Sequence, residues 1–152
     1  MRSGPSIKIS LRSDPQLLCV VRGALEHLTG TLGLSAPDCR AVVLAVDEAL
    51  TNIMRHAYHG RPDKPIELSC RRVYRKNGSS RGPGLEIVLI DRGSPVKREK
   101  MHSRPLDQVR PGGLGLHFIK ESMDIVEYKR LGATNRLRLV KFLSSQAQSQ
   151  EP

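Results

Sequence analysis

The spacing of hydrophobic and polar residues divides the first 60 positions into one strand and two helices. Apolar and polar side chains alternate over residues 7–11, which predicts a half-buried strand. From Asp14-Pro15 to Gly30, apolar residues recur every three or four positions, and an aspartate cap followed by proline is a helix start. The same spacing over residues 35–60, opened by a capping sequence, predicts a second and longer helix.

The rest of the chain alternates mainly with a period of two residues. Four strands are expected, at residues 66–71, 85–90, 125–130 and 135–142. A long loop without apolar periodicity, residues 92–112, precedes a short helix that begins near Leu116, and we interpret this loop as a functional lid. The elements together predict an α+β two-layer sandwich, with a mixed, mainly antiparallel sheet and helices on one face.

Length and composition fit a single domain. The chain has 152 residues, of which 38% are hydrophobic, and we expect a domain at 1–143 and a disordered polar tail at 144–152. The longest apolar run is far shorter than the ~20 residues that cross a membrane, so we expect a soluble, cytoplasmic protein. The cysteines Cys19, Cys39 and Cys70 are widely spaced and odd in number, which predicts buried free thiols.

Positive charge is concentrated in the middle of the chain. The formal net charge is +10, and residues 61–110 carry 13 of the 25 basic side chains but only 6 of the 15 acidic ones. Such a segment suits a polyanion, either the phosphates of a ligand or an acidic partner surface. Nucleic-acid binding is a weaker alternative, because aromatic residues make up 3% of the chain and provide little stacking surface.

Two polar residues of the second predicted helix are candidates for chemistry. Glu48 and Asn52 are four positions apart, so they lie on one helix face, beside the apolar stripe. A carboxylate can accept the proton of an attacking hydroxyl, and an amide oxygen is a hard ligand suited to Mg²⁺. Taken alone, the pair is better explained as ordinary solvated polar positions of a helix.

A third candidate follows the strand predicted at residues 85–90. Asp91 shares the side-chain parity of the apolar residues of that strand, so it should point toward the core. A buried carboxylate needs hydrogen-bond donors, and the exocyclic amine of adenine is one. The alternative is an aspartate that caps the following turn.

A glycine-rich turn, Gly112 to Leu116, stands just before the short predicted helix. Unpaired N–H groups at a helix start suit a phosphate, and Arg104 and Arg110 could add charge there. The turn matches neither the Walker pattern nor a dinucleotide fingerprint, and a plain turn is the alternative. His56 and His59 lack a third ligand at metal spacing, which favours a helix-terminal pair over a metal site.

Three segments in fixed order resemble one known superfamily. The helix AVVLAVDEALTNIMRHAYHG, the strand end IVLIDRGSP and the turn-helix GGLGLHFIKESMDIVEY resemble the N box and the two glycine boxes of the GHKL ATPases. Within that superfamily, the short chain with these motifs is similar to the bacterial anti-sigma-factor serine/threonine-protein kinases. The resemblance covers about residues 6–143 and implies the Bergerat fold and binding of ATP with Mg²⁺.

The resemblance also implies roles for individual residues. Glu48 would be the general base, and Asn52 would hold Mg²⁺. Asp91 and Gly93 would read adenine. Further nucleotide contacts are implied for His56, Arg110, Gly113, Leu114, Gly115 and Thr134, and Asn135 is left open beside Thr134.

Members of this family sequester a sigma factor and phosphorylate a serine of a STAS-domain anti-anti-sigma antagonist. The resemblance therefore implies these two partners and a homodimer, without direct contact to nucleic acid or a membrane. It leaves Ser94 and Pro95 without a role. The alternative function is a regulatory module that binds ATP and sequesters a partner protein without transferring phosphate.

Overall fold

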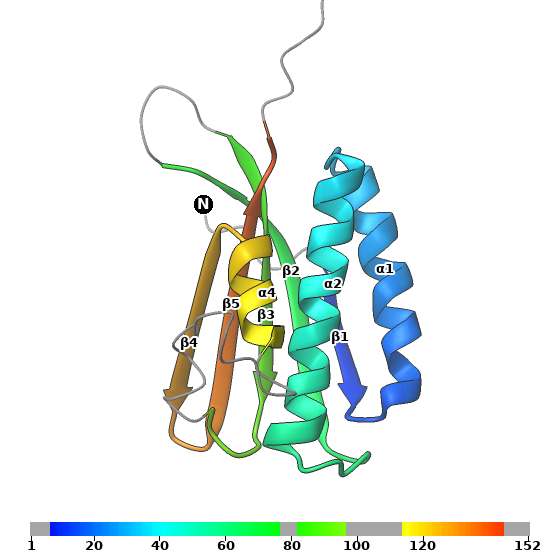
Figure 1. Cartoon of the computed structure of the whole chain (residues 1–152), viewed down its shortest axis with the longest axis vertical. Helices are drawn as coiled ribbons and strands as arrows, with labels where there is room; N and C mark the ends of the chain where they lie inside the picture. Colours follow the sequence, from blue (N-terminus) through cyan, green and yellow to red (C-terminus); the bar gives the residue numbers. More distant parts are fainter. Residues whose placement is uncertain (1–6, 77–81, 97–113, 145–152) are drawn as a thin grey trace, which may run out of the picture.

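A computed structural model describes residues 7–76, 82–96 and 114–144 as one sheet covered by helices on one face (Figure 1). Residues 145–152 of the predicted tail, residues 77–81 between two predicted strands, and most of the predicted lid lie outside these ranges, so the predicted domain boundaries stay predictions. The strands are β1 (Ile7–Arg12), β2 (Pro65–Tyr74), β3 (Pro83–Asp91), β4 (Ile125–Leu131) and β5 (Thr134–Phe142), and the α-helices are α1 (Leu18–Thr31), α2 (Ala36–Asn52) and α4 (Leu114–Ser122).

The strands lie in the order β1-β2-β3-β5-β4, and all four pairings among the described residues are antiparallel. The expected α+β sandwich is confirmed, but the sheet is not mixed. The reason is visible between β1 and its neighbour β2. Two helices, α1 and α2, connect these strands, and the chain reverses three times on the way from β1 through α1 and α2 to β2, so β2 runs opposite to β1.

Both predicted helix starts are confirmed. The Asp14 carboxylate accepts a hydrogen bond of 3.0 Å from the Gln16 amide and opens a short 3₁₀ turn, Pro15–Leu17, which continues into α1. Ser35 caps α2 by accepting from the Asp38 amide. These caps satisfy amide groups that have no partner inside a helix, which fixes where each helix begins.

The second helix changes character at its C-terminal end. After α2, residues Ile53–Ala57 form a π-helical turn, in which the amide of Tyr58 donates to the carbonyl of Ile53. The expected helix to about Gly60 is therefore correct in position but not regular throughout. Such π turns occur often at functional sites, because they redirect side chains near a helix end.

The core lies between the sheet and the helices. Fully buried side chains come from both layers, the helices and the sheet, and include Leu25 of α1, Leu50 of α2, Leu68 of β2, Ile87 of β3 and Leu139 of β5. No helix in the described part of the chain is long and apolar enough to cross a membrane.

The cysteines differ from one another in exposure. All three are free thiols, but Cys70 alone is buried, whereas Cys39 is partly buried and Cys19 is exposed. Burial raises the pKa of the Cys70 thiol to about 12. The expectation of three buried thiols is thus wrong for Cys19, which occupies the solvent-facing side of α1.

Candidate functional site

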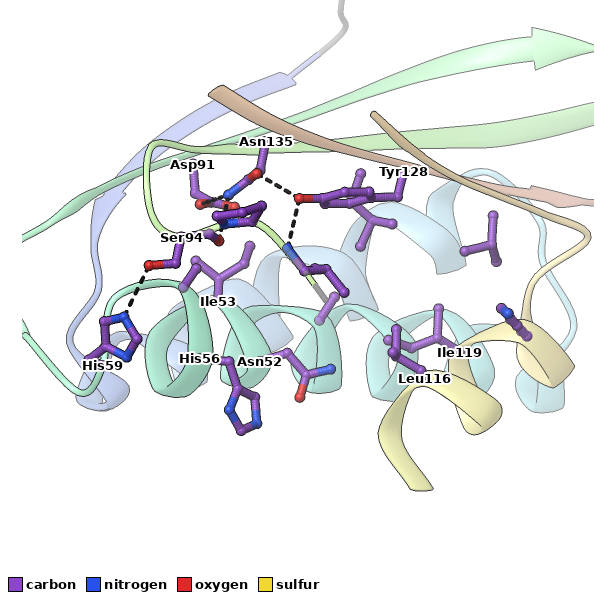
Figure 2. Close-up of a pocket in the computed structure, with 17 residues that line it drawn as sticks. Asn52, Ile53, His56, His59, Asp91, Ser94, Leu116, Ile119, Tyr128 and Asn135 are labelled. Atoms are coloured by element: carbon purple, nitrogen blue, oxygen red, sulfur yellow. Dashed lines mark hydrogen bonds between the residues drawn. The ribbon is translucent and has the colours of Figure 1, made fainter. Parts of the chain in front are cut away.

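A cavity of about 420 Å³ opens between the C-terminal half of α2, helix α4 and the adjoining parts of β3, β4 and β5 (Figure 2). Its volume is in the range of small-molecule sites. Most of its wall is apolar, with Ile53, Leu116, Ile119, Val126 and Leu137 among the lining side chains. The polar groups that it does contain are few, which makes each of them informative about a ligand.

Asp91 is the buried acid of this cavity. It ends β3 with the side-chain parity predicted from the sequence and is 5% exposed. Its Oδ1 accepts from the amide of Gly93 at 2.9 Å and from the side chain of Asn135 at 2.8 Å. Both bonds are to Oδ1, and among the described residues no donor bonds to Oδ2. Burial raises the pKa of Asp91, although these two bonds and the nearby Arg130 oppose the shift.

Asn135 connects Asp91 to strand β4. The Asn135 side chain is 3% exposed, and its Oδ1 accepts from the Tyr128 hydroxyl at 2.6 Å and from Arg130 Nη1 at 2.8 Å. Its Nδ2 faces acceptors instead, including the carbonyl of Ser94 at 3.1 Å. Donors on one side and acceptors on the other fix the amide in a single orientation.

The segment that follows β3, residues 92–96, is held by hydrogen bonds to side chains and to the π-helical turn after α2. Its one residue without an N–H group is Pro95. Each of the other four amides donates a hydrogen bond: Arg92 to the Tyr58 hydroxyl, Gly93 to Asp91, Ser94 to the carbonyl of Ala57, and Val96 to the Tyr128 hydroxyl. The cavity wall on this side is therefore formed before any ligand binds, and Ser94 acquires a structural role that the sequence did not suggest.

Gly93 permits the close approach of this segment to the π-helical turn. A Cβ atom at this position would lie 2.4 Å from the carbonyl oxygen of Ala57, well inside van der Waals contact. The residue is needed for packing, because any side chain would force the two backbones apart. This observation supplies a physical reason for the glycine that the resemblance assigned to the nucleotide site.

The helix residues singled out in the sequence are brought to the same place. Asn52 and His56 line the cavity from the end of α2 and the π-helical turn. Glu48 is partly buried and lies one turn earlier on α2, roughly 6 Å along the helix axis from Asn52. It is not among the residues that line the cavity, so it lies beside the site rather than within it.

On strand β5, the structure shows which of the adjacent residues Thr134 and Asn135 lines the cavity. Asn135 lines the cavity, whereas Thr134 does not. Asn135 shares the parity of Leu137 and Leu139, which face the helices, and Thr134 therefore points to the other side of the sheet. Thr134 thus lies one position away from the residue that lines the cavity, and a nucleotide contact of Thr134 stays a prediction.

The predicted phosphate site lies only partly within the described residues. Arg104, Arg110 and Gly113 lie outside the described residues, while Leu114 and Gly115 form the first turn of α4. In the described part of the chain, no three His, Cys, Asp or Glu side chains gather in a way that could hold a metal ion. His59 instead lies at the cavity rim, with its Nε2 3.0 Å from the Ser94 hydroxyl.

Tyr128 is the site residue that sequence reasoning missed. Its signal was present, since it shares the parity of Val126 in the strand predicted at 125–130 and so faces the helices. A hydroxyl on the core side of a strand needs a hydrogen-bond partner. Which partner it finds depends on the pairing of β4 with β5, which the sequence does not reveal.

Comparison with known proteins gives consistent matches over the same region. The model of a family described as the histidine kinase-like ATPase domain matches residues 11–141. A serine-protein kinase RsbW of Bacillus pumilus is 26% identical over 146 residues, which are 91% of this chain and 86% of that protein. An RsbW of Bacillus licheniformis is 28% identical over 152 residues, covering 94% and 89%.

A solved structure shares the fold. The crystal structure of the RsbU and RsbW domains of Rv1364c from Mycobacterium tuberculosis aligns with a TM-score of 0.65 and 19% identity. The alignment covers 95% of this chain and 34% of that chain, so this protein spans about a third of its length. At this identity the similarity shows the fold alone, and the Bergerat-type sandwich expected from the sequence is confirmed.

Proposed function

The chain belongs to the histidine kinase-like ATPase family, and on that premise we propose that it is an ATP-dependent protein-serine kinase and anti-sigma factor. It would sequester a sigma factor and phosphorylate a serine of a STAS-domain antagonist, which would prevent the antagonist from releasing the sigma factor. The named relatives that match along nearly the whole chain are serine-protein kinases, which supports a transfer of phosphate to protein.

One observation carries the proposal: Asn52 from α2 and Asp91 from β3 line the same cavity, although 39 positions separate them in the sequence. Asp91 Oδ2 has no hydrogen-bond donor among the described residues, and the apolar walls around it suit an aromatic base. The arrangement fits adenine, whose amine would donate to Asp91 Oδ2 and whose ring would pack on side chains such as Ile53 and Leu137.

The donors of the site also fit Mg²⁺. Asn52 lines the cavity and has one amide oxygen, and Mg²⁺ commonly takes one or two protein oxygens while phosphates and water complete its shell. With adenine bound at Asp91, the phosphates of ATP would extend toward Asn52 and the start of α4. Bound Mg²⁺ would neutralise phosphate charge during transfer.

Glu48 is proposed as the general base. A carboxylate one helical turn from Asn52 would lie beside the metal-bound phosphates and open to a second protein. It would accept the proton of the substrate serine as the serine oxygen forms a bond to the γ-phosphorus. The bond between that phosphorus and the β-phosphate oxygen breaks, and ADP leaves with the electron pair.

The test combines the purified full chain, Mg-ATP and a STAS-domain protein from the same genome. We expect phosphoserine on the STAS protein, and Glu48→Gln should retain ATP binding while losing at least about a hundredfold in transfer rate. Glu26→Gln, at an exposed position of α1, is the matched control and should transfer normally. Normal transfer by Glu48→Gln would refute the assignment of the base.

The same experiment separates the kinase from a purely regulatory module. A regulatory module that only binds ATP would form a nucleotide-dependent complex with its partner protein. No phosphate would then appear on that partner with any divalent metal. Sedimentation of the free chain tests the proposed homodimer, and co-purification with a sigma factor from a cytoplasmic extract tests the second partner and the expected location.

A further inference from the structure

Two side chains of strand β4 donate hydrogen bonds to Asn135, the residue that donates to Asp91. The Tyr128 hydroxyl and Arg130 Nη1 both donate to Asn135 Oδ1, at 2.6 and 2.8 Å. The Tyr128 oxygen in turn accepts from the amide of Val96 at 3.0 Å. Figure 2 shows this chain of bonds running from the segment after β3 through Tyr128 and Asn135 to Asp91.

The direction of these bonds has a chemical consequence. With its oxygen directed at two donors, Asn135 must present its Nδ2 to Asp91, and it does so at 2.8 Å. A reversed amide would set its oxygen against the carboxylate of Asp91 and would leave both donors from β4 without an acceptor. The Tyr128 hydroxyl therefore favours the one amide orientation in which Asn135 donates to Asp91 and Asp91 acts as the acceptor.

We propose that Tyr128 is a positioning residue for base recognition, which acts through Asn135 to keep Asp91 as an acceptor for the 6-amino group of a purine. The consequence is selection for an amine over a carbonyl at purine position 6. This inference rests on the proposed binding of ATP at Asp91, but it does not depend on phosphate transfer. Tyr128 also lines the cavity, but its hydroxyl is bonded to Asn135 and to the amide of Val96, so its proposed effect on the purine is exerted through Asn135.

Equilibrium binding of two nucleotides to the full chain tests the proposal. ATP carries the amine, and inosine triphosphate carries a carbonyl at the same position. We expect the wild-type chain to prefer ATP, and Tyr128→Phe to weaken ATP binding about three- to tenfold while changing inosine triphosphate binding less than about twofold. The matched control is Tyr74→Phe, which removes the same hydroxyl from a side chain that is 55% exposed on β2.

A purely structural role for Tyr128 predicts a different result. Loosening of the cavity would weaken both nucleotides equally, and an unchanged preference in Tyr128→Phe would overturn the proposal. A double-mutant cycle adds a second criterion, because Tyr128→Phe should cost little further ATP affinity in an Asp91→Asn chain if it acts through Asp91. Additive losses would contradict the inference.

The outcomes also separate this inference from the proposed function. A chain that prefers ATP, loses that preference in Tyr128→Phe and transfers no phosphate would retain the inference and refute the kinase. A wild-type chain that binds both nucleotides equally would refute the inference, whatever its activity.

Discussion

Asp91 and Asn135 stand directly opposite each other in the register of β3 and β5, and the Asn135 amide donates a hydrogen bond of 2.8 Å to Asp91 Oδ1. The two residues are 44 positions apart in the sequence. Their contact joins the acid of the candidate site to the neighbouring strand. Four predictions follow from this contact, from the packing around it and from the charged cluster on the open face of the sheet.

Replacing the donor of this pair should impair nucleotide binding. Asn135→Asp exchanges the Nδ2 donor for a carboxylate oxygen that faces Asp91, so two like charges compete for one buried position. We expect ATP affinity to fall at least about tenfold, measured by titration calorimetry. Thr134→Ala, one position away on the other side of the sheet, should bind ATP as the wild type does. Equal binding by both variants would show that Asn135 has no part in the site.

Gly93 should not tolerate a side chain. In Gly93→Ala the new Cβ would lie 2.4 Å from the Ala57 carbonyl oxygen, so the segment after β3 must move away from the π-helical turn. We expect a loss of about 1–3 kcal/mol in the free energy of unfolding, measured by urea denaturation. Gly23→Ala is the contrasting control, because a Cβ there meets nothing within 4 Å, and it should stabilise α1 by about 0.5–1 kcal/mol.

The buried hydroxyl of Tyr58 should contribute to stability. It donates to the carbonyl of Pro65 at 2.6 Å and accepts from the amide of Arg92 at 2.8 Å. Tyr58→Phe removes both bonds and leaves two backbone groups without this partner, which should cost about 1–3 kcal/mol in the free energy of unfolding. The exposed Tyr74 provides the comparison, since Tyr74→Phe should change stability by less than about 0.5 kcal/mol.

Acid sensitivity should depend on Glu86, on the face of the sheet away from the helices. Glu86 is 2% exposed and accepts hydrogen bonds from Arg71 and from Arg138. Burial opposes its ionisation, but the two arginines outweigh this effect and lower the pKa of Glu86 below its ordinary value of 4.5. The stability that the ionised group provides is therefore complete above pH 4.5 and is lost as the pH falls through the lowered pKa.

The variant Glu86→Gln lacks this titration. Its free energy of unfolding should be lower than that of the wild type near neutral pH, and the difference should shrink as the pH falls from about 5 to about 3. Glu67→Gln is the control on the same face, because the ion pair of Glu67 with Lys8 is exposed to solvent and contributes little. A difference that is independent of pH would contradict the role of charge at Glu86.

The elements of the fold are predictable from the sequence because their signals are local. Alternation over a few residues predicts β1 and β2, and the caps at Asp14 and Ser35 predict where the first two helices begin. The errors arise where the signal is not local. The π-helical turn after α2 has the same apolar spacing as a regular helix, and the wholly antiparallel sheet depends on how the strands pair.

The residues of the candidate site also differ in whether a local pattern in the sequence could identify them. Glu48, Asn52 and Asp91 could be selected because helix spacing and strand parity determine which way a side chain points. Thr134 and Asn135 could not be told apart, because a shift of one position along a strand moves a side chain to the opposite face. That Asn135 lines the cavity beside Asp91 follows from the register of β5 against β3.

The sequence by itself thus determined the order of the elements, the face that each buries, and the helix and strand that carry the candidate acid and metal ligand. Only the tertiary structure decided that Asn52 and Asp91 line one cavity and that Tyr128 reaches Asp91 through Asn135. The physical reason is that caps and periodicity act over neighbouring residues, whereas hydrogen bonds between strands require a register that many distant contacts set together.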